Sequence, residues 1–167
     1  MKTASLISGI LLVSVFAFTA SPAGAAKPPK PVSAKDFDGA AQAALAAMKT
    51  RAAELHIQGV AIVSFASGDT IQGWMSRMAV VGHMTDQAGG KANNLLGIAY
   101  AKASEMANTL KDSGTSGQPP MTGEFGWQGG VILRTGKGFL IVAFSGGKSE
   151  DDVEVSKAGL AVLKARL

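Results

Sequence analysis

Two histidines limit the metal and acid–base chemistry that this chain of 167 residues can perform. His56 closes a segment with helical periodicity, where a histidine commonly contacts the last carbonyl groups of the helix. His83 lies in a glycine-flanked segment, next to Met84 and downstream of Met78. Histidine and methionine are both known axial ligands of haem iron. His83 is therefore the candidate iron ligand, with Met84 and Met78 beside it, although most single loop histidines are solvated or packed in a core.

Residue types alone permit two further metal sites. A soft copper(I) site could draw on four side chains, those of Met75, Met78, His83 and Met84. The spacing of Met75 and Met78 argues against it, because in a strand they would face opposite sides of the sheet. The carboxylates of Glu150–Asp152 could chelate a hard cation. An acidic first helical turn is, however, a common source of helix stability, since it faces the exposed N–H groups.

The chain lacks the residues on which several enzyme classes depend. It contains no cysteine, which removes disulfides, thiolate nucleophiles and cysteine-based zinc or iron–sulfur centres. Ser145-Gly146-Gly147 lacks the G-x-S-x-G frame of a nucleophile elbow. The formal net charge is +4, and basic and acidic residues are interleaved without an aromatic-studded basic stripe. We therefore predict no catalytic residue and no nucleic-acid partner.

Few large aromatic side chains are available to form a ligand pocket. Trp74, Tyr100 and Phe125 are expected mainly in the core or at a subunit interface. Trp127 follows a long loop and precedes Gly129-Gly130. It is the candidate wall of a pocket for a flat ligand.

The first residues have the pattern of a secretory signal peptide. Lys2 precedes an apolar run, Leu6–Ala20, and Ala23-Gly24-Ala25 is a cleavage site of the A-x-A type. We predict a signal peptide over 1–25, a Pro/Lys linker over 26–35 and one domain over 36–167. Cleavage after Ala25 or Ala26 would give a periplasmic or secreted protein without a membrane partner. A retained membrane anchor is the alternative.

The elements that must position the candidate residues follow from apolar periodicity and turn residues. Ser33 and Asp36 form a capping-box pattern before apolar residues at spacings of three and four. They predict a helix that ends near His56–Gly59, with Gly59 as its terminator. Val60–Phe65 predicts a strand, and Thr70–Arg77 its hairpin partner.

The middle of the chain is expected to combine an irregular connection with a second helix. The connection covers Met78–Gly90, and the helix runs from about Lys91 to Leu110. Lys102 and Leu110 fall on the inner side of this helix, among alanines and larger apolar residues. Ser113–Phe125 is too rich in Gly, Pro and Ser for a regular element, and loops of that length are usually functional or disordered.

The last third predicts a hairpin followed by a helix. Val131–Arg134 and Phe139–Phe144 are the strands, and Ser149 is the expected N-cap of the helix. The order is therefore α-β-β-α-β-β-α. Tight hairpins give a mainly antiparallel sheet, so we predict a single α+β domain with helices packed on the sheet.

The C-terminal sequence resembles one known family. The resemblance rests on Val142–Val155, which holds the Ser145-Gly146-Gly147 turn and the acidic helix start, on Lys157–Ala161, and on Gly129-Gly130-Val131 upstream. This ending is similar to that of the HbpS-like/GlcG-like haem-degrading (haem-binding) family, formerly a domain of unknown function. The remainder of Asp36–Leu163 matches in compatible order but less specifically.

The resemblance implies a profilin-like domain that forms homo-oligomers and binds haem or another tetrapyrrole. Its candidate binding residues here are His83, Met84, Met78 and Trp127, with His83 on the iron. Ala66-Ser67-Gly68-Asp69 departs from the family pattern where a pocket would be shaped, so the fold is expected to transfer better than the ligand. Haem degradation rests on the resemblance alone. The alternative is a non-catalytic oligomeric structural or interaction module without a small ligand.

Overall fold

The structure is a computed structural model that describes residues 30–87, 90 and 92–167. The predicted signal peptide, residues 1–25, and the linker up to residue 29 lie outside the described residues. Within the described part of the chain, no helix has both the length and the apolar character needed to cross a bilayer.

The first helix, α1 (Ala34–Glu54), begins at the predicted capping box. The hydroxyl oxygen of Ser33 accepts the N–H of Asp36 at 3.2 Å, and the carboxylate of Asp36 accepts the N–H of Ser33 at 3.4 Å. Residues 34–35, which the sequence analysis places in the linker, are therefore helical. The buried face of α1 carries the apolar residues at the predicted spacings: Phe37, Ala40, Ala41, Ala44, Leu45, Met48 and Ala52.

The prediction that Gly59 ends α1 is wrong. Leu55 is the C-cap, and His56 takes the left-handed conformation (φ 55°) that usually follows a helix end. Histidine is among the residues that tolerate this conformation. Gly59 instead begins the first strand, where a Cβ atom would overlap the carbonyl oxygen of Ser145. Its small size serves the close approach of two strands.

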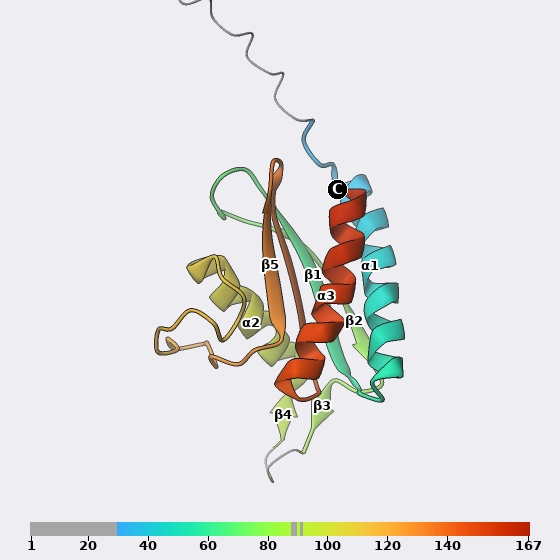
Figure 1. The fold of residues 1–167 in the computed structure, drawn as a ribbon, viewed down its shortest axis with the longest axis vertical. Coiled ribbons are helices and arrows are strands. Elements are labelled where there is room, and N and C mark those ends of the chain that lie inside the picture. The colour runs from blue at the N-terminus through green and yellow to red at the C-terminus, as the bar shows by residue number, and fades with distance from the viewer. Residues whose placement is uncertain (1–29, 88–89, 91) are drawn as a thin grey trace, which may run out of the picture.

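Four antiparallel strands form the main sheet, in the order β2-β1-β6-β5 (Figure 1). They are β1 (Gly59–Ser67), β2 (Met75–Val81), β5 (Gly130–Thr135) and β6 (Gly138–Ser145). The central pair, β1 and β6, is buried on both faces, which explains its continuous apolar sequence. Val63 pairs with Val142 in the middle of this pair.

The second strand lies further along the chain than predicted. Residues 70–74 belong to the loop, and β2 continues to Val81, so that it pairs with β1 from Phe65 opposite Met75 to Gly59 opposite Val81. The predicted irregular connection therefore starts at Gly82. The remainder of that connection includes β3 (Thr85–Asp86), which pairs with β4 (Asn93–Asn94). An edge strand that is only half-buried carries a weak apolar pattern, so its boundaries were hard to predict.

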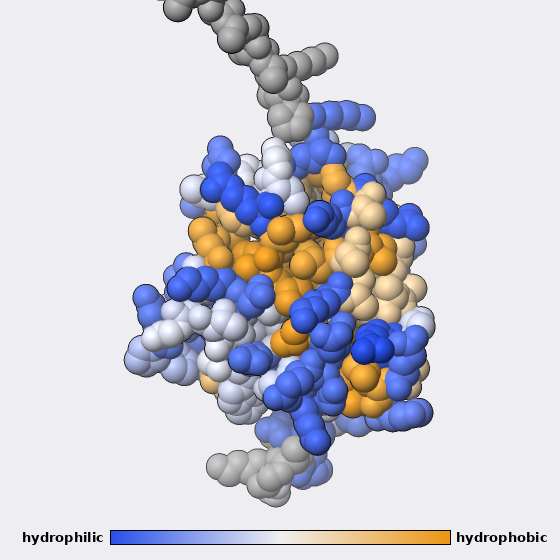
Figure 2. Space-filling model, viewed as in Figure 1, coloured by the Kyte–Doolittle hydropathy of each residue, from blue (hydrophilic) through white to orange (hydrophobic). Residues whose placement is uncertain are grey.

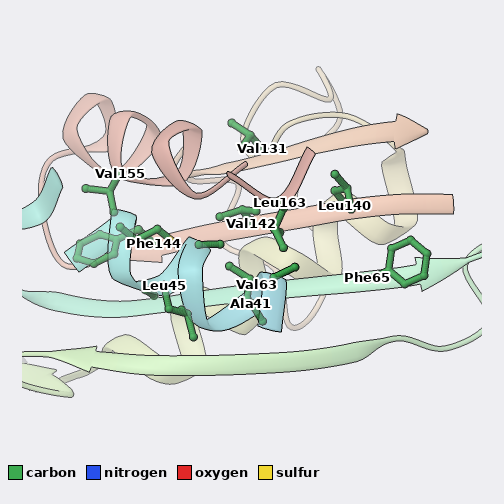
Figure 3. Close-up of a cluster of buried hydrophobic side chains, with 14 of the residues drawn as sticks. Ala41, Leu45, Val63, Phe65, Val131, Leu140, Val142, Phe144, Val155 and Leu163 are labelled. Atoms are coloured by element: carbon green, nitrogen blue, oxygen red, sulfur yellow. The ribbon is translucent and has the colours of Figure 1, made fainter. Parts of the chain in front are cut away.

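Helices cover both faces of the sheet. The first helix, α1, and α3 (Ser149–Arg166) lie side by side on one face, and α2 (Leu95–Thr109) lies on the other (Figure 1). Figure 3 shows the first core, where Leu45 of α1 and Val155 of α3 lie near Phe144, while Phe65 lies towards the other end of the sheet. The second core, under α2, contains Ile62, Ile98, Met106 and Ile141. The predicted α+β class, with helices on a mainly antiparallel profilin-like sheet, is confirmed.

Two helix starts differ from the predictions. Helix α2 begins at Leu95 rather than Lys91, because the side chain of Asn94 caps it by accepting the N–H of Gly97 at 3.0 Å. The N-cap of α3 is Lys148 rather than Ser149, and it makes no side-chain cap bond. Leu110, predicted on the inner side of α2, is 53% exposed in a left-handed C-cap.

Candidate functional site

The long loop between α2 and β5 is fixed at its base by polar contacts. The carboxylate of Glu105 on α2 accepts the N–H of Gly114 at 2.7 Å. Ser113 accepts the N–H of Gly130 at 2.8 Å, and Asp112 accepts the N–H of Ile132 at 2.9 Å. The last two bonds also satisfy donors at the free edge of β5, which would otherwise be open to pairing with another strand.

This loop presents two aromatic rings beside α2. The rings of Phe125 and Trp127 stack with their centroids 4.9 Å apart and their planes at 30°. They are 46% and 49% exposed, which is high for such large apolar side chains. Across from them lies a cleft of about 440 Å³, which we call the aromatic cleft. Its wall on α2 is built from Gly97, Ile98 and Ala101.

A second cleft, of about 350 Å³, lies on the other side of Trp127 and reaches the start of α3. We call it the polar cleft, because hydrogen-bonding side chains from several elements line it: Asp86, Asn93, Lys102, Gln128, Ser145, Ser149 and Asp152. The two clefts share Asn93, Ile98 and Trp127. The two clefts therefore adjoin at these residues.

A buried ion pair forms part of the polar cleft. The ammonium of Lys102 lies 2.8 Å from the carboxylate of Asp152 and donates at 2.8 Å to the carbonyl of Phe144. The other oxygen of Asp152 accepts the N–H of Gly147 at 2.8 Å. Burial lowers the pKa of Lys102 and raises that of Asp152, while the attraction between the two charges opposes both shifts.

The ion pair also supports the end of the long loop. A side chain at Gly129 would overlap the ammonium of Lys102, so only glycine allows the backbone to pass there. The carbonyl of Gly129 accepts the hydroxyl of Ser156 at 2.7 Å and the N–H of Phe144 at 3.0 Å. The pair thus connects α2, α3 and the loop that carries Trp127.

Sequence reasoning missed this pair. Lys102 was predicted on the inner side of α2, and Asp152 was interpreted only as a first-turn stabiliser. The available signal was a single cation among buried alanines and apolar residues, since a buried ammonium requires an anionic partner. The sequence did not indicate which carboxylate this would be, because the two residues lie far apart in the chain.

The structure places only one of the four predicted binding residues in the site. Trp127 lines both clefts, whereas His83, Met84 and Met78 line neither. His83 is exposed, and its Nδ1 lies 2.7 Å from the amide oxygen of Gln58. Met84 is 40% exposed, and its carbonyl accepts the N–H of Leu95 at 2.9 Å. Met78 packs half-buried against the core under α2.

The other metal sites considered are not assembled. Met75 packs in the core of α1 and α3, and Met78 in the opposite core, as their spacing predicted. Of the three acidic residues at the start of α3, Asp152 turns inward to Lys102. Among the residues that the structure describes, no group of three or more histidines or carboxylates could hold a metal ion.

A four-stranded antiparallel sheet with two helices on one face and one on the other, and a cleft beside the single helix, defines a profilin-like α+β domain. The chain matches no protein-family model and no curated protein. Solved structures share its fold, among them the following two.

The first is PduOC in complex with haem, with a TM-score of 0.54 and 15% identity, over 80% of this chain and 95% of that one. The second is the Klebsiella pneumoniae protein ORFY, which belongs to DUF336. Its TM-score is 0.55 with 16% identity, over 76% of this chain and 89% of that one. At these identities the likeness establishes the fold.

Proposed function

We propose that this protein is exported and binds a flat tetrapyrrole, such as haem, in the aromatic cleft, without turning it over. The observation that carries this proposal is the stacked pair Phe125 and Trp127, about half exposed, opposite the small residues Gly97 and Ala101. Small residues leave a helix surface against which a planar ring can lie closely. Half-exposed aromatic rings offer the matching stacking surface.

The fold supports the choice of ligand class. PduOC, which shares the fold, forms a complex with haem. ORFY carries the name DUF336, which denotes the GlcG-like family. That is the family which the C-terminal sequence of this chain resembles.

The cleft residues fit the ring of a tetrapyrrole better than its metal. Among the described residues, no histidine or methionine lines either cleft, so the ring would be held mainly by stacking on Trp127 and by contact with Ile98. An iron centre, where present, supplies a coordination position. We retain His83 as its proposed ligand and Met84 as the second candidate. Both precede β3, whose Asp86 lines the polar cleft.

Titration with haemin, followed at the Soret band, tests the function. We expect Trp127→Ala to weaken binding by about 1–3 kcal/mol, the usual contribution of one aromatic stacking partner, which is a five- to 150-fold rise in Kd. Met121→Ala is the matched control, because Met121 is an exposed apolar residue of the same loop that lines neither cleft. Equal affinities of wild type and Trp127→Ala would place the ligand elsewhere, and a wild type without any Soret change would remove the proposed function.

The same titration separates ring binding from iron ligation. If His83 is the iron ligand, His83→Ala shifts the Soret maximum. An unchanged spectrum would remove His83 from the site and leave the proposed stacking in the aromatic cleft unaffected.

Export is tested by N-terminal sequencing of protein from a periplasmic or culture fraction. The processed protein should begin at Ala26 or Lys27.

A second candidate function is an oligomeric interaction module without a small ligand. The observation in its favour is apolar surface over the β5 edge of the sheet, flanked by hydrophilic residues (Figure 2). Half-buried Ile132 and Leu133 belong to that strand. Light scattering that reveals an oligomer, together with no response to haemin, would favour this function over the first.

A further inference from the structure

Four basic side chains surround a hollow beside the start of α1 and the end of α3. These two helix ends lie at the same end of the molecule (Figure 1). Lys30 precedes α1, and Lys35 lies in its first turn. Lys137 comes from the turn between β5 and β6, and Arg166 from the end of α3. The hollow has a volume of about 430 Å³. We call these four residues the basic end.

The basic end is not neutralised by the side chains around it. Among the described residues, none of its four cations has a side-chain carboxylate within 4.0 Å. Lys137 donates to the carbonyl of Leu167. Positive charges remain in excess even when the one lining side-chain carboxylate, Asp36, is counted.

The nearby carboxylates are already engaged. Asp36 accepts the hydroxyl of Ser33 at 2.7 Å in the capping box of α1. Asp69 lies 2.7 Å from Arg134. Asp36 and Asp69 therefore have partners, whereas Lys30, Lys35 and Arg166 have no ion-pair partner among the described residues, and the field of this end is positive.

The covalent chain leads from this end towards an apolar segment. Lys30 follows Ala20, the last residue of the apolar run, by ten positions. Ten extended residues span at most about 35 Å. Whenever the run lies in a bilayer, as in an export precursor, the basic end must stay within about 35 Å of it. Lys27, on the same connection, adds another positive charge.

We propose that the basic end binds the surface of an anionic lipid membrane. Its four cations are all exposed, so they match an extended layer of headgroups better than a single small anion, which would call for convergent buried donors. This peripheral contact replaces the expectation that the protein has no membrane partner after cleavage. It does not depend on tetrapyrrole binding.

Co-sedimentation of the full chain with lipid vesicles tests the proposal. One set of vesicles is pure phosphatidylcholine, and the other contains about one-third phosphatidylglycerol. Each basic residue near an anionic surface contributes about 1 kcal/mol, or about fivefold in the partition coefficient. We therefore expect Lys35→Gln/Lys137→Gln/Arg166→Gln to lose at least tenfold in binding to the anionic vesicles.

The matched control is Lys49→Gln/Lys111→Gln/Lys148→Gln, which removes the same charge from exposed positions outside the hollow. It should lose less than twofold. If both triple variants lost binding to anionic vesicles equally, net charge alone would account for the binding, and the proposal would be overturned. Equal binding of wild type to both kinds of vesicle would overturn it as well. Release from anionic vesicles by millimolar inorganic phosphate at constant ionic strength would assign the hollow to a soluble anion instead.

Discussion

At the scale of single residues, the buried pair of Lys102 and Asp152 has a desolvation cost that opposes the attraction between its two charges. Both groups lose hydration on burial, and their contact together with the bonds to Phe144, Gly146 and Gly147 compensates for that loss. The pair is therefore not a large source of net stability while it is intact. Its importance lies in what happens when one partner is removed.

Asp152→Asn should lower the free energy of unfolding by about 3–5 kcal/mol, because it leaves the ammonium of Lys102 buried without a counter-charge. Urea unfolding measures the change. In the double variant Lys102→Met/Asp152→Asn, the loss should be smaller than in Asp152→Asn alone, since no charge remains buried. Glu150→Gln, which removes an exposed carboxylate from the same helical turn, is the control and should cost less than about 1 kcal/mol. A loss in Asp152→Asn no larger than in Glu150→Gln would contradict this account.

Gly129 and Gly136 provide a matched test of close packing. At Gly129, where φ is 134°, a Cβ atom would overlap the ammonium of Lys102. Gly129→Ala should therefore destabilise the protein by about 1–3 kcal/mol, the usual range for overpacking. A Cβ atom at Gly136 meets nothing within 4 Å, so Gly136→Ala should be close to neutral. Thermal unfolding compares them, and a Gly129→Ala variant as stable as Gly136→Ala would show that the loop end can move aside.

At the scale of elements, local sequence signals predicted most of the fold. The capping box of Ser33 and Asp36, the apolar runs of β1 and β6, and the hairpin turn before Gly138 were all recognisable because each is determined by neighbouring residues. The start of β2 could not be recognised from the sequence, because the register of this strand is set by its pairing with β1 across the sheet. Leu110 was misplaced because a helix end depends on backbone conformation that apolar spacing does not encode.

The candidate site was predicted less well than the fold, for a related reason. Trp127 was identified from its place after a long loop, whereas its loop neighbour Phe125 was expected in the core or at an interface. Lys102 joins the site only through tertiary packing. His83 and Met84 were chosen for their chemistry, which says nothing about whether they face a cleft. Residue type indicates what a side chain can bind, and the fold determines what it can reach.

The α1 cap makes one element sensitive to acid. The hydrogen bonds from Ser33 lower the pKa of Asp36, and nearby Lys30 and Lys35 contribute. The unfolded chain then binds this proton at higher pH than the folded one. The stabilising contribution is fully present above the ordinary pKa of 3.8 and is lost as the pH falls through the lowered value. The stability difference between wild type and Ser33→Ala should therefore shrink as the pH falls below 3.8, as measured by urea unfolding. A stability difference that stayed constant with pH would show that ionised Asp36 does not contribute to the cap.

At the scale of the whole molecule, the aromatic and polar clefts lie far from the basic end. The polar cleft reaches the first turn of α3, and Arg166 ends the same helix. Eighteen helical residues span about 27 Å. Figure 1 shows β3 and β4, which border the clefts, at the opposite end from the start of α1. A protein bound to a membrane through its basic end would thus keep its clefts open to solvent.

The pairing of β1 with β6 has a consequence for the time at which folding can occur. The two central strands come from opposite parts of the chain, so the middle of the sheet cannot form until Ser145 has been synthesised. Before that point, β1 can pair only with β2, and a two-stranded hairpin alone is marginally stable in water. A growing chain therefore stays loose until nearly all of it exists. For the export that we propose, this delay would keep the polypeptide unfolded while it passes through a channel, and the sheet would close on the far side.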